Sequence, residues 1–129
     1  MKLKLKIINL EGIYLEQEVD YINLTIASGN VTILARHIPL ISSIKISHMH
    51  IVNDNIETQY AIAGGTLFVD EEGCKIITPA IERSDEIDFE RAMQSKERAE
   101  QRLALENDDI DYKRAQVSLL RALNRLTFK

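Results

Sequence analysis

The sequence predicts an α+β chain in two segregated parts: an antiparallel β-sandwich in residues 1–84 and an antiparallel helical hairpin in residues 85–129. Three observations support this fold class. Short apolar segments with closely spaced turn signals fill the first part, which also holds all five glycines of the chain. The apolar period changes from about 2 to about 3.6 residues near Arg83–Asp88. A pentapeptide that begins at Asp88 recurs in similar form from Asp111.

The first part reads as several short strands separated by turn signals, a pattern that suggests a sandwich or a barrel. Lys2–Ile7 alternates lysine with apolar side chains, so a strand here would have a charged face and a core face. Further strands are expected within 13–26, 31–34, 44–52, 57–63, 66–69 and 74–78. Gly64-Gly65 is expected to form a tight turn or a bulge between two strands. No Lys-Ser/Thr follows it, so a phosphate loop is not indicated.

The second part reads as two matched helices. Asp88-Phe89-Glu90-Arg91-Ala92 is echoed by Asp111-Tyr112-Lys113-Arg114-Ala115, and each copy continues with arginines at i, i+7 and i+11. Positions so spaced fall within about 40° on a helix, so each copy predicts an alanine stripe beside an arginine stripe. Each aspartate is expected to be an N-cap. The acidic segment 106–109 is expected to connect the two helices.

Composition and charge exclude several classes of protein. The chain has 129 residues, 45% hydrophobic and 28% charged, which is typical of one small folded domain with an appendage. A net charge of −4 argues against general nucleic-acid binding. No apolar run approaches the ~18 residues that span a bilayer, and no signal peptide is evident, so a cytosolic location is expected.

The charge is unevenly distributed within the hairpin. Residues 85–109 carry nine acids and four bases, a net −5, whereas residues 111–129 carry one acid and five bases, a net +4. Opposite charges on the two halves favour a closed hairpin, although exposed ion pairs contribute only about 0–1 kcal/mol each.

No residues predict catalysis or a metal site. His48 and His50 would share one face of a strand, but no Cys/His cluster with ligand spacing lies nearby, so an exposed strand face is expected. His37 lies on a loop without a partner nucleophile. The lone Cys74 cannot form an internal disulfide. We therefore expect no catalytic residues and no metal.

The arginine stripes are the strongest functional signal. Two matched stripes on antiparallel helices would bring several guanidinium groups together, which is costly unless an anion lies between them. Guanidinium groups bind phosphate oxygens through two hydrogen bonds at once. A triphosphate and an acidic segment of a partner protein both satisfy this requirement, and the residues alone leave the choice open.

Four blocks and the hairpin together resemble the epsilon-subunit family of bacterial F-type ATP synthases over essentially the whole chain. The blocks are Asn9-Leu10-Glu11-Gly12, Val19–Leu24, Thr32–Leu40 and Ala61–Val69. The resemblance implies a ten-stranded sandwich that binds the gamma subunit and the c-ring. It also implies a mobile hairpin that obstructs ATP hydrolysis by the catalytic alpha and beta subunits. The expected role is non-catalytic, at the cytoplasmic side of the bacterial cell membrane, which the protein meets only through the complex.

The resemblance also implies an ATP site. Ile87-Asp88-Phe89-Glu90-Arg91-Ala92 matches the family's motif of Ile or Leu, Asp, two variable residues, Arg and Ala. The expected ATP-binding residues are Glu82, Ile87, Asp88, Arg91, Ala92, Arg98, Arg121 and Arg125. ATP would be a regulatory ligand that closes the hairpin, and no cofactor would be required. The alternative is a free-standing ATP-binding sensor without a rotary complex.

A contact with the c-ring is expected at two loops. Its candidates are Ser28, Gly29, Asn30 and His37, because these loops face the ring in the family. The segments Asn30-Val31-Thr32 and Ala35-Arg36 stand where the family usually has Glu-Ile/Met-Gly and Pro-Gly. We therefore expect the contact to differ in detail from that of typical members.

Overall fold

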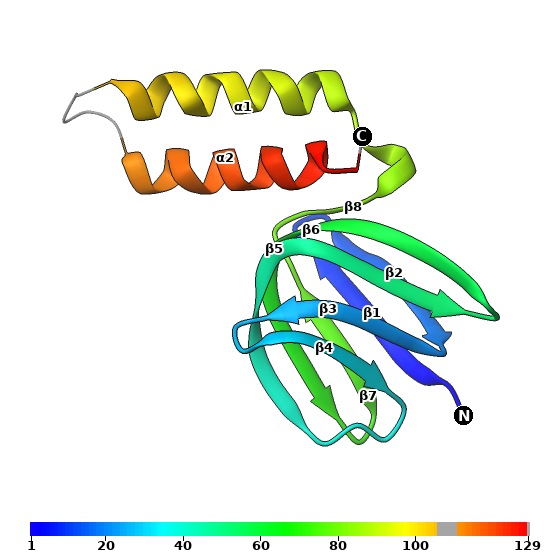
Figure 1. Ribbon diagram of the computed structural model, residues 1–129. Helices are drawn as coiled ribbons and strands as arrows, with labels where there is room; N and C mark the ends of the chain where they lie inside the picture. The colour runs from blue at the N-terminus through cyan, green and yellow to red at the C-terminus, as the bar shows by residue number, and fades with distance from the viewer. Residues whose placement is uncertain (106–110, 129) are drawn as a thin grey trace. The chain divides into compact units, whose positions relative to one another are not determined.

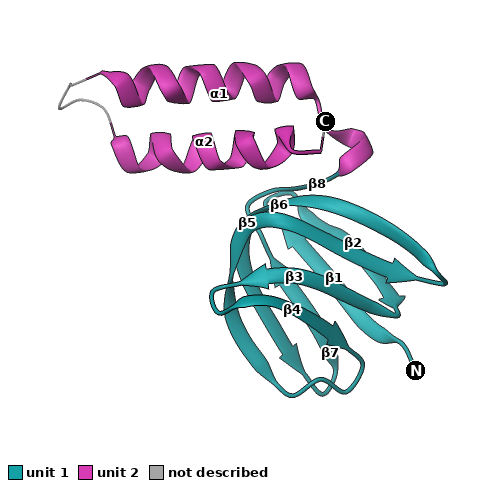
Figure 2. Cartoon of the chain, in the orientation of Figure 1, with its two compact units in different colours: residues 1–83 teal, residues 84–129 magenta. Residues whose placement is uncertain are grey.

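A computed structural model describes residues 1–105 and 111–128, and the chain divides into two compact units, Met1–Arg83 and Ser84–Lys129 (Figure 2). The strands of the first unit are β1 (Leu3–Asn9), β2 (Gly12–Val19), β3 (Tyr21–Ile26), β4 (Gly29–Leu34), β5 (Leu40–Asn53), β6 (Ile56–Asp70), β7 (Gly73–Ile77) and β8 (Ile81–Arg83). The helices of the second are η1 (Ser84–Glu86), α1 (Phe89–Ala104) and α2 (Tyr112–Leu126) (Figure 1). The predicted fold class, a sandwich followed by a helical hairpin, is confirmed. The acidic segment 106–109 lies outside the described residues.

The strands form one hydrogen-bonded sheet that folds over into a sandwich. Its order is β2-β1-β7-β6-β5-β3-β4, and β8 pairs with β6. Every pair in the described residues is antiparallel except β1 with β7, which is parallel. Parallel neighbours need a long connection, and here nearly the whole unit separates the two strands in sequence. This pair departs from the all-antiparallel sandwich that the sequence suggested.

The strands β5 and β6 pass through both layers of the sandwich. They are 14 and 15 residues long, and β6 pairs with β8 through its first half and with β7 through its second. The predicted break at Gly64-Gly65 is therefore wrong, because one strand continues through it. Counting β5 and β6 twice adds two strands to the eight in the sheet, which gives the ten that the resemblance implied.

Glycine is needed where β6 changes layers. Gly64 and Gly65 have φ of +83° and +133°, which other residues adopt only with strain. A Cβ on Gly65 would lie 2.2 Å from the carbonyl oxygen of Ile77. The buried hydroxyl of Thr78 donates a 2.6 Å hydrogen bond to the carbonyl oxygen of Gly64. Close backbone approach, rather than a turn, thus explains the two glycines.

Large aliphatic side chains fill the sandwich. On β1, Leu3, Leu5 and Ile7 are buried while Lys4 is exposed, which confirms the alternation expected from the sequence. The largest side chains without solvent access, at under 2% exposure, are Leu5, Ile7, Ile22, Leu24, Ile33, Met49, Ile62, Leu67, Ile76 and Val19. They come from seven of the strands, so the core depends on contacts between segments distant in sequence.

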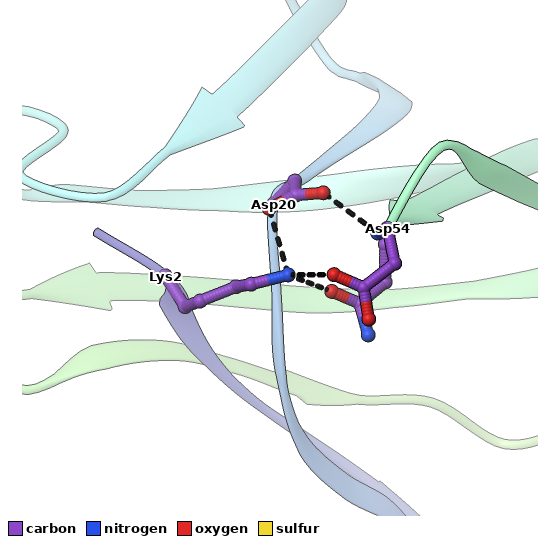
Figure 3. Close-up of polar contacts among 4 residues, drawn as sticks. Lys2, Asp20 and Asp54 are labelled. Carbon is purple, nitrogen blue, oxygen red and sulfur yellow. Dashed lines mark hydrogen bonds and ion pairs between the residues drawn. The ribbon is translucent and has the colours of Figure 1, made fainter.

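A polar clip joins the N-terminus to two turns of the sandwich (Figure 3). The Lys2 ammonium lies 2.9 Å from Asp20 Oδ1 and 2.8 Å from Asp54 Oδ1, and it also donates to the side chain of Asn53. Asp54 N donates a 2.8 Å hydrogen bond to Asp20 Oδ2. The pKa of Lys2 is raised mainly by its hydrogen bond to Asp54 and, to a smaller extent, by its hydrogen bond to Asp20. The pKa of Asp20 is lowered mainly by the hydrogen bond from Lys2 and, to a smaller extent, by the one from the backbone N–H of Asp54.

The two helices begin in the same way. Asp88 Oδ1 accepts a 3.0 Å hydrogen bond from Arg91 N, and Asp111 Oδ1 accepts one of the same length from Arg114 N. Both predicted N-caps are therefore confirmed. A carboxylate at this position satisfies an otherwise unpaired backbone N–H and interacts favourably with the helix dipole.

Candidate functional site: the arginine face of the hairpin

Alanines form the contact between α1 and α2. The buried residues of the two helices are Ala92, Ala99, Ala115 and Ala122, each with 2% exposure or less. They occupy equivalent positions in the two copies of the repeat, so the predicted alanine stripe is confirmed. Small side chains allow the helix axes to approach closely.

One face of the hairpin carries the arginines. An arginine directly precedes each seam alanine: Arg91, Arg98, Arg114 and Arg121. In right-handed helices that run in opposite directions, the residue before a seam position lies on the same face of the pair in either helix. Arg102 and Arg125 follow one turn after Arg98 and Arg121 and extend the two rows. We call this surface, with its six arginines, the arginine face.

Arg121 has the most unusual environment on the arginine face. Its Nε is buried and has no hydrogen-bond partner within residues 1–105 and 111–128. A buried polar group without a partner costs about 1–3 kcal/mol, and more when it is charged. Among the described residues, the Nε–H of Arg121 is therefore a hydrogen-bond donor without an acceptor.

Arg121 also lines a hollow of about 450 Å³ on α2. The described residues that line it are Asp111, Lys113, Arg114, Val117, Ser118 and Arg121. Of the residues predicted to bind ATP, the described lining contains only Arg121. Sequence reasoning did not select Lys113 or Arg114, although the repeat had already placed Arg114 at the position equivalent to Arg91.

The other predicted ATP residues occupy several kinds of position. Ile87 is buried, at 8% exposure, directly before the N-cap of α1. Arg91 and Arg98 are exposed, and Arg98 Nη2 donates a 3.4 Å hydrogen bond to Ser95 Oγ. Arg125 is half-buried in the last turn of α2. The hairpin thus contains seven of the eight predicted residues.

Glu82 is the exception. It lies on β8, where it pairs with Ala61 of β6, and so belongs to the first unit. Its side chain is half-buried. In the sequence, η1 and Ile87 lie between β8, which contains Glu82, and the start of the hairpin. The participation of Glu82 in an ATP site with the hairpin residues stays a prediction.

The four candidates for the c-ring contact fall at two places. Ser28 lies in the β3–β4 turn and Gly29 is the first residue of β4. Asn30 exchanges side-chain hydrogen bonds of 2.8 and 3.0 Å with Asn23. His37 follows the opposite end of β4, where its Nδ1 lies 2.7 Å from the carbonyl oxygen of Ile38. The six residues of β4 separate the two places by about 17–20 Å. The contact of these four residues with the c-ring stays a prediction.

His48 and His50 are half-buried on the face of β5 opposite Met49. Met49 between them is fully buried, and His50 Nδ1 lies 2.7 Å from Glu57 Oε1. Within the part of the chain that the structure describes, no three His, Cys, Asp or Glu side chains are grouped to hold a metal ion. No described helix is both long and apolar enough to cross a bilayer.

Comparison with protein families gives matches to both units. The β-sandwich domain of the ATP synthase delta/epsilon chain matches residues 2–84, and the long α-helix domain of that chain matches residues 85–128. An ATP synthase epsilon chain from Herpetosiphon aurantiacus is 37% identical over 101 residues, covering 78% of this chain and 74% of that protein. One from Shouchella clausii is 35% identical over 105 residues, covering 81% and 79%.

Comparison with solved structures gives the same fold. A chain in the mitochondrial ATP synthase of Euglena gracilis, in a structure of OSCP, F1 and the c-ring, matches with a TM-score of 0.81. The match has 19% sequence identity and covers 95% of this chain and 78% of that one. At this identity the likeness supports the fold alone.

Proposed function

The chain belongs to the ATP synthase delta/epsilon family as an epsilon-type stalk subunit, and on that premise we propose that its hairpin is a nucleotide-gated inhibitor of ATP hydrolysis. The sandwich would bind the gamma subunit and the c-ring and help to couple rotation to ATP synthesis. The extended hairpin would meet the catalytic alpha and beta subunits. The subunit itself would be non-catalytic, peripheral to the bacterial cell membrane on its cytoplasmic side.

The observation that carries this proposal is the shared face of Arg91, Arg98, Arg121 and Arg125. These residues come from both helices, so an anion bound across them would require the hairpin to be closed. Several guanidinium groups on one face repel each other, and a triphosphate removes that repulsion while forming hydrogen bonds with two oxygens per group. ATP would therefore bind the closed hairpin in preference to the extended one.

The weakness of the helix contact makes gating by a ligand feasible. The hairpin is joined by alanines, which bury little apolar surface, and two helices of 16 and 15 residues are marginal alone. A ligand that binds only the closed form stabilises it by about 2.7 kcal/mol at a hundredfold excess over Kd. That energy shifts a balanced equilibrium about a hundredfold.

Calorimetric titration of the full chain with ATP tests the proposal, using Arg91→Gln/Arg125→Gln as the variant. Saturable 1:1 binding that weakens at least about tenfold in the variant is expected, because each lost guanidinium removes charge-assisted hydrogen bonds. Lys96→Gln is the matched control. Lys96 lies four residues after Ala92, on the side of the helix contact away from the arginine face. Its Nζ is 3.7 Å from Glu100 Oε1. Equal ATP affinity in all three proteins would exclude the site.

Activity of the assembled complex provides the second test. Hydrolysis by the complex carrying this subunit should be more inhibited at low ATP than at high ATP, and the Arg91→Gln/Arg125→Gln variant should lose that dependence. Co-purification with a membrane ATPase separates this role from that of a free-standing ATP sensor. A chain that binds ATP but never co-purifies with the complex would support the sensor.

A further inference from the structure

We propose that α2 holds a second anion site, formed by Lys113, Arg114 and Arg121, which takes the phosphate groups of a small oligophosphate. The proposal goes beyond the nucleotide gate, because two of its three cations are not in the predicted ATP set. It rests on three observations: the hollow on α2, the partnerless Nε of Arg121 and the internal repeat.

The hollow is of suitable size and charge. Its volume of about 450 Å³ falls within the range of about 300–1,000 Å³ for small-molecule sites. Three of the described lining side chains are cationic, and one, Asp111, is acidic. Asp111 Oδ1 already accepts the capping hydrogen bond from Arg114 N, which lowers its capacity to neutralise the cations. The described residues offer no ion-pair partner to Lys113 or Arg114.

The repeat explains why a second site exists. The two copies have equivalent N-caps and equivalent buried alanines, so a pseudo-twofold axis between the antiparallel helices relates them. This axis maps Arg91 onto Arg114 and Arg98 onto Arg121. An anion site that uses Arg91 and Arg98 of α1 therefore has a counterpart that uses Arg114 and Arg121 of α2.

The two copies of the repeat differ at one position in a way that favours the second site. Lys113 occupies the position equivalent to Glu90 in the first copy. An acid beside the first site repels a phosphate, whereas the lysine at the second attracts it. The hydroxyl of Tyr112 donates to the carbonyl oxygen of Leu105, which joins the start of α2 to the end of α1. Lys113 and Arg114 thus lie next to a bond that joins the two helices.

The lining also predicts what the site does not recognise. Val117 is its one apolar side chain among the described lining residues, and no aromatic ring is present there to stack on a base. We expect the site to bind phosphate groups irrespective of any attached nucleoside. Free pyrophosphate and the phosphate chain of a nucleotide share this chemistry.

The test uses the full-length Arg91→Gln/Arg125→Gln protein, in which the proposed ATP site has lost two of its four arginines. Calorimetric titration with pyrophosphate at low ionic strength should still show 1:1 binding. Adding Lys113→Gln and Arg114→Gln should weaken it at least about tenfold, whereas adding Lys96→Gln should leave it within about twofold. The cap survives Arg114→Gln because it uses the backbone N–H, and circular dichroism checks that the helices remain.

Three further outcomes decide the proposal. The Arg121 Nε–Hε resonance should shift on adding pyrophosphate and should not shift in the protein that lacks Lys113 and Arg114. The affinities of the Arg91→Gln/Arg125→Gln protein for ATP and for pyrophosphate are then compared. If ATP binds no more tightly than pyrophosphate, the site recognises the phosphate groups alone. If ATP binds more tightly, the phosphate groups that the site takes belong to a nucleotide. Absence of binding at millimolar pyrophosphate, or equal binding with and without Lys113 and Arg114, would overturn the second site. Both of these negative results would be informative whether or not ATP gates the hairpin.

Discussion

The two units of this chain are stabilised in contrasting ways. The sandwich buries large aliphatic side chains from most of its strands, whereas the buried residues of α1 and α2 are four alanines. Burial of a Leu or Ile side chain contributes about 1.5–3 kcal/mol, and an alanine contributes far less. The hairpin meanwhile exposes Leu120 and Leu123 at 55% and 39%. One unit is therefore firmly packed, and the other is held together by a weak contact between its helices.

This difference determines where a ligand can act. A phosphate compound worth about 3 kcal/mol of binding free energy changes little in a unit whose core contributes many times that amount. The same energy would be enough to decide between open and closed forms of two helices joined by alanines. Under the proposed function, regulation would therefore belong to the hairpin, and the sandwich would supply a stable attachment.

The largest test of the comparison removes one leucine from each unit. Leu67→Ala should lower the free energy of unfolding of the sandwich by about 2–5 kcal/mol, because Leu67 is fully buried and the vacated volume stays partly empty. Leu123→Ala, at a site with 39% exposure, should change stability by no more than about 0.5 kcal/mol. Urea unfolding followed by circular dichroism measures both. Comparable losses in the two variants would mean that the hairpin is as firmly packed as the sandwich.

The second test uses alkaline pH to probe the sandwich core. Burial, followed by the charge of Asp70, raises the pKa of the Cys74 thiol from 9.0 to about 12. Between these values the unfolded thiol ionises while the folded one keeps its proton, so stability falls as pH rises, by up to about 1.4 kcal/mol per pH unit. Cys74→Ala should lack this component. Denaturant unfolding at pH 8, 10 and 11 measures the free energy of unfolding of both proteins. From pH 8 to pH 11 the parent should lose more stability than Cys74→Ala, and an equal loss in both proteins contradicts the prediction.

A smaller effect is expected at the two helix starts. Asp88→Ala and Asp111→Ala should each destabilise the hairpin by about 1 kcal/mol, because each removes a 3.0 Å capping hydrogen bond. The sandwich should unfold at an unchanged denaturant concentration. Amide hydrogen exchange in α1 and α2 resolves this local loss. Asp88→Asn and Asp111→Asn, which keep a capping oxygen, serve as matched controls and should exchange nearly as slowly as the parent.

The smallest effect is expected from the exposed clip at the N-terminus. Lys2→Met should destabilise the sandwich slightly at neutral pH. The lowered pKa of Asp20 means that its contribution is present above pH 3.8 and is lost as pH falls through the folded pKa. The raised pKa of Lys2 means that its contribution is present below pH 10.5 and is lost above that value. The two proteins should therefore converge in stability in strong acid, and a difference that persists at pH 2 would show that the clip acts through packing instead.

Local chemistry was readable from the sequence. The alternation of Lys4 and Leu5, the N-caps at Asp88 and Asp111, and the alanine stripe on both helices follow from residue spacing within single segments. Each depends on neighbours within about one or two turns of chain, which periodicity encodes directly. The two-part fold class followed from the same signals.

Tertiary structure decided what depends on distant segments. The parallel pairing of β1 with β7, and the passage of β6 through Gly65 against the backbone of Ile77, are set by strand order that no local pattern contains. Folding likewise separated Ser28 from His37 along β4 and left the Nε of Arg121 without a partner beside the hollow that Lys113 and Arg114 line. The sequence by itself determined that the arginines form two stripes, and helix packing decided that the Nε of Arg121 is buried without a hydrogen-bond partner among the described residues.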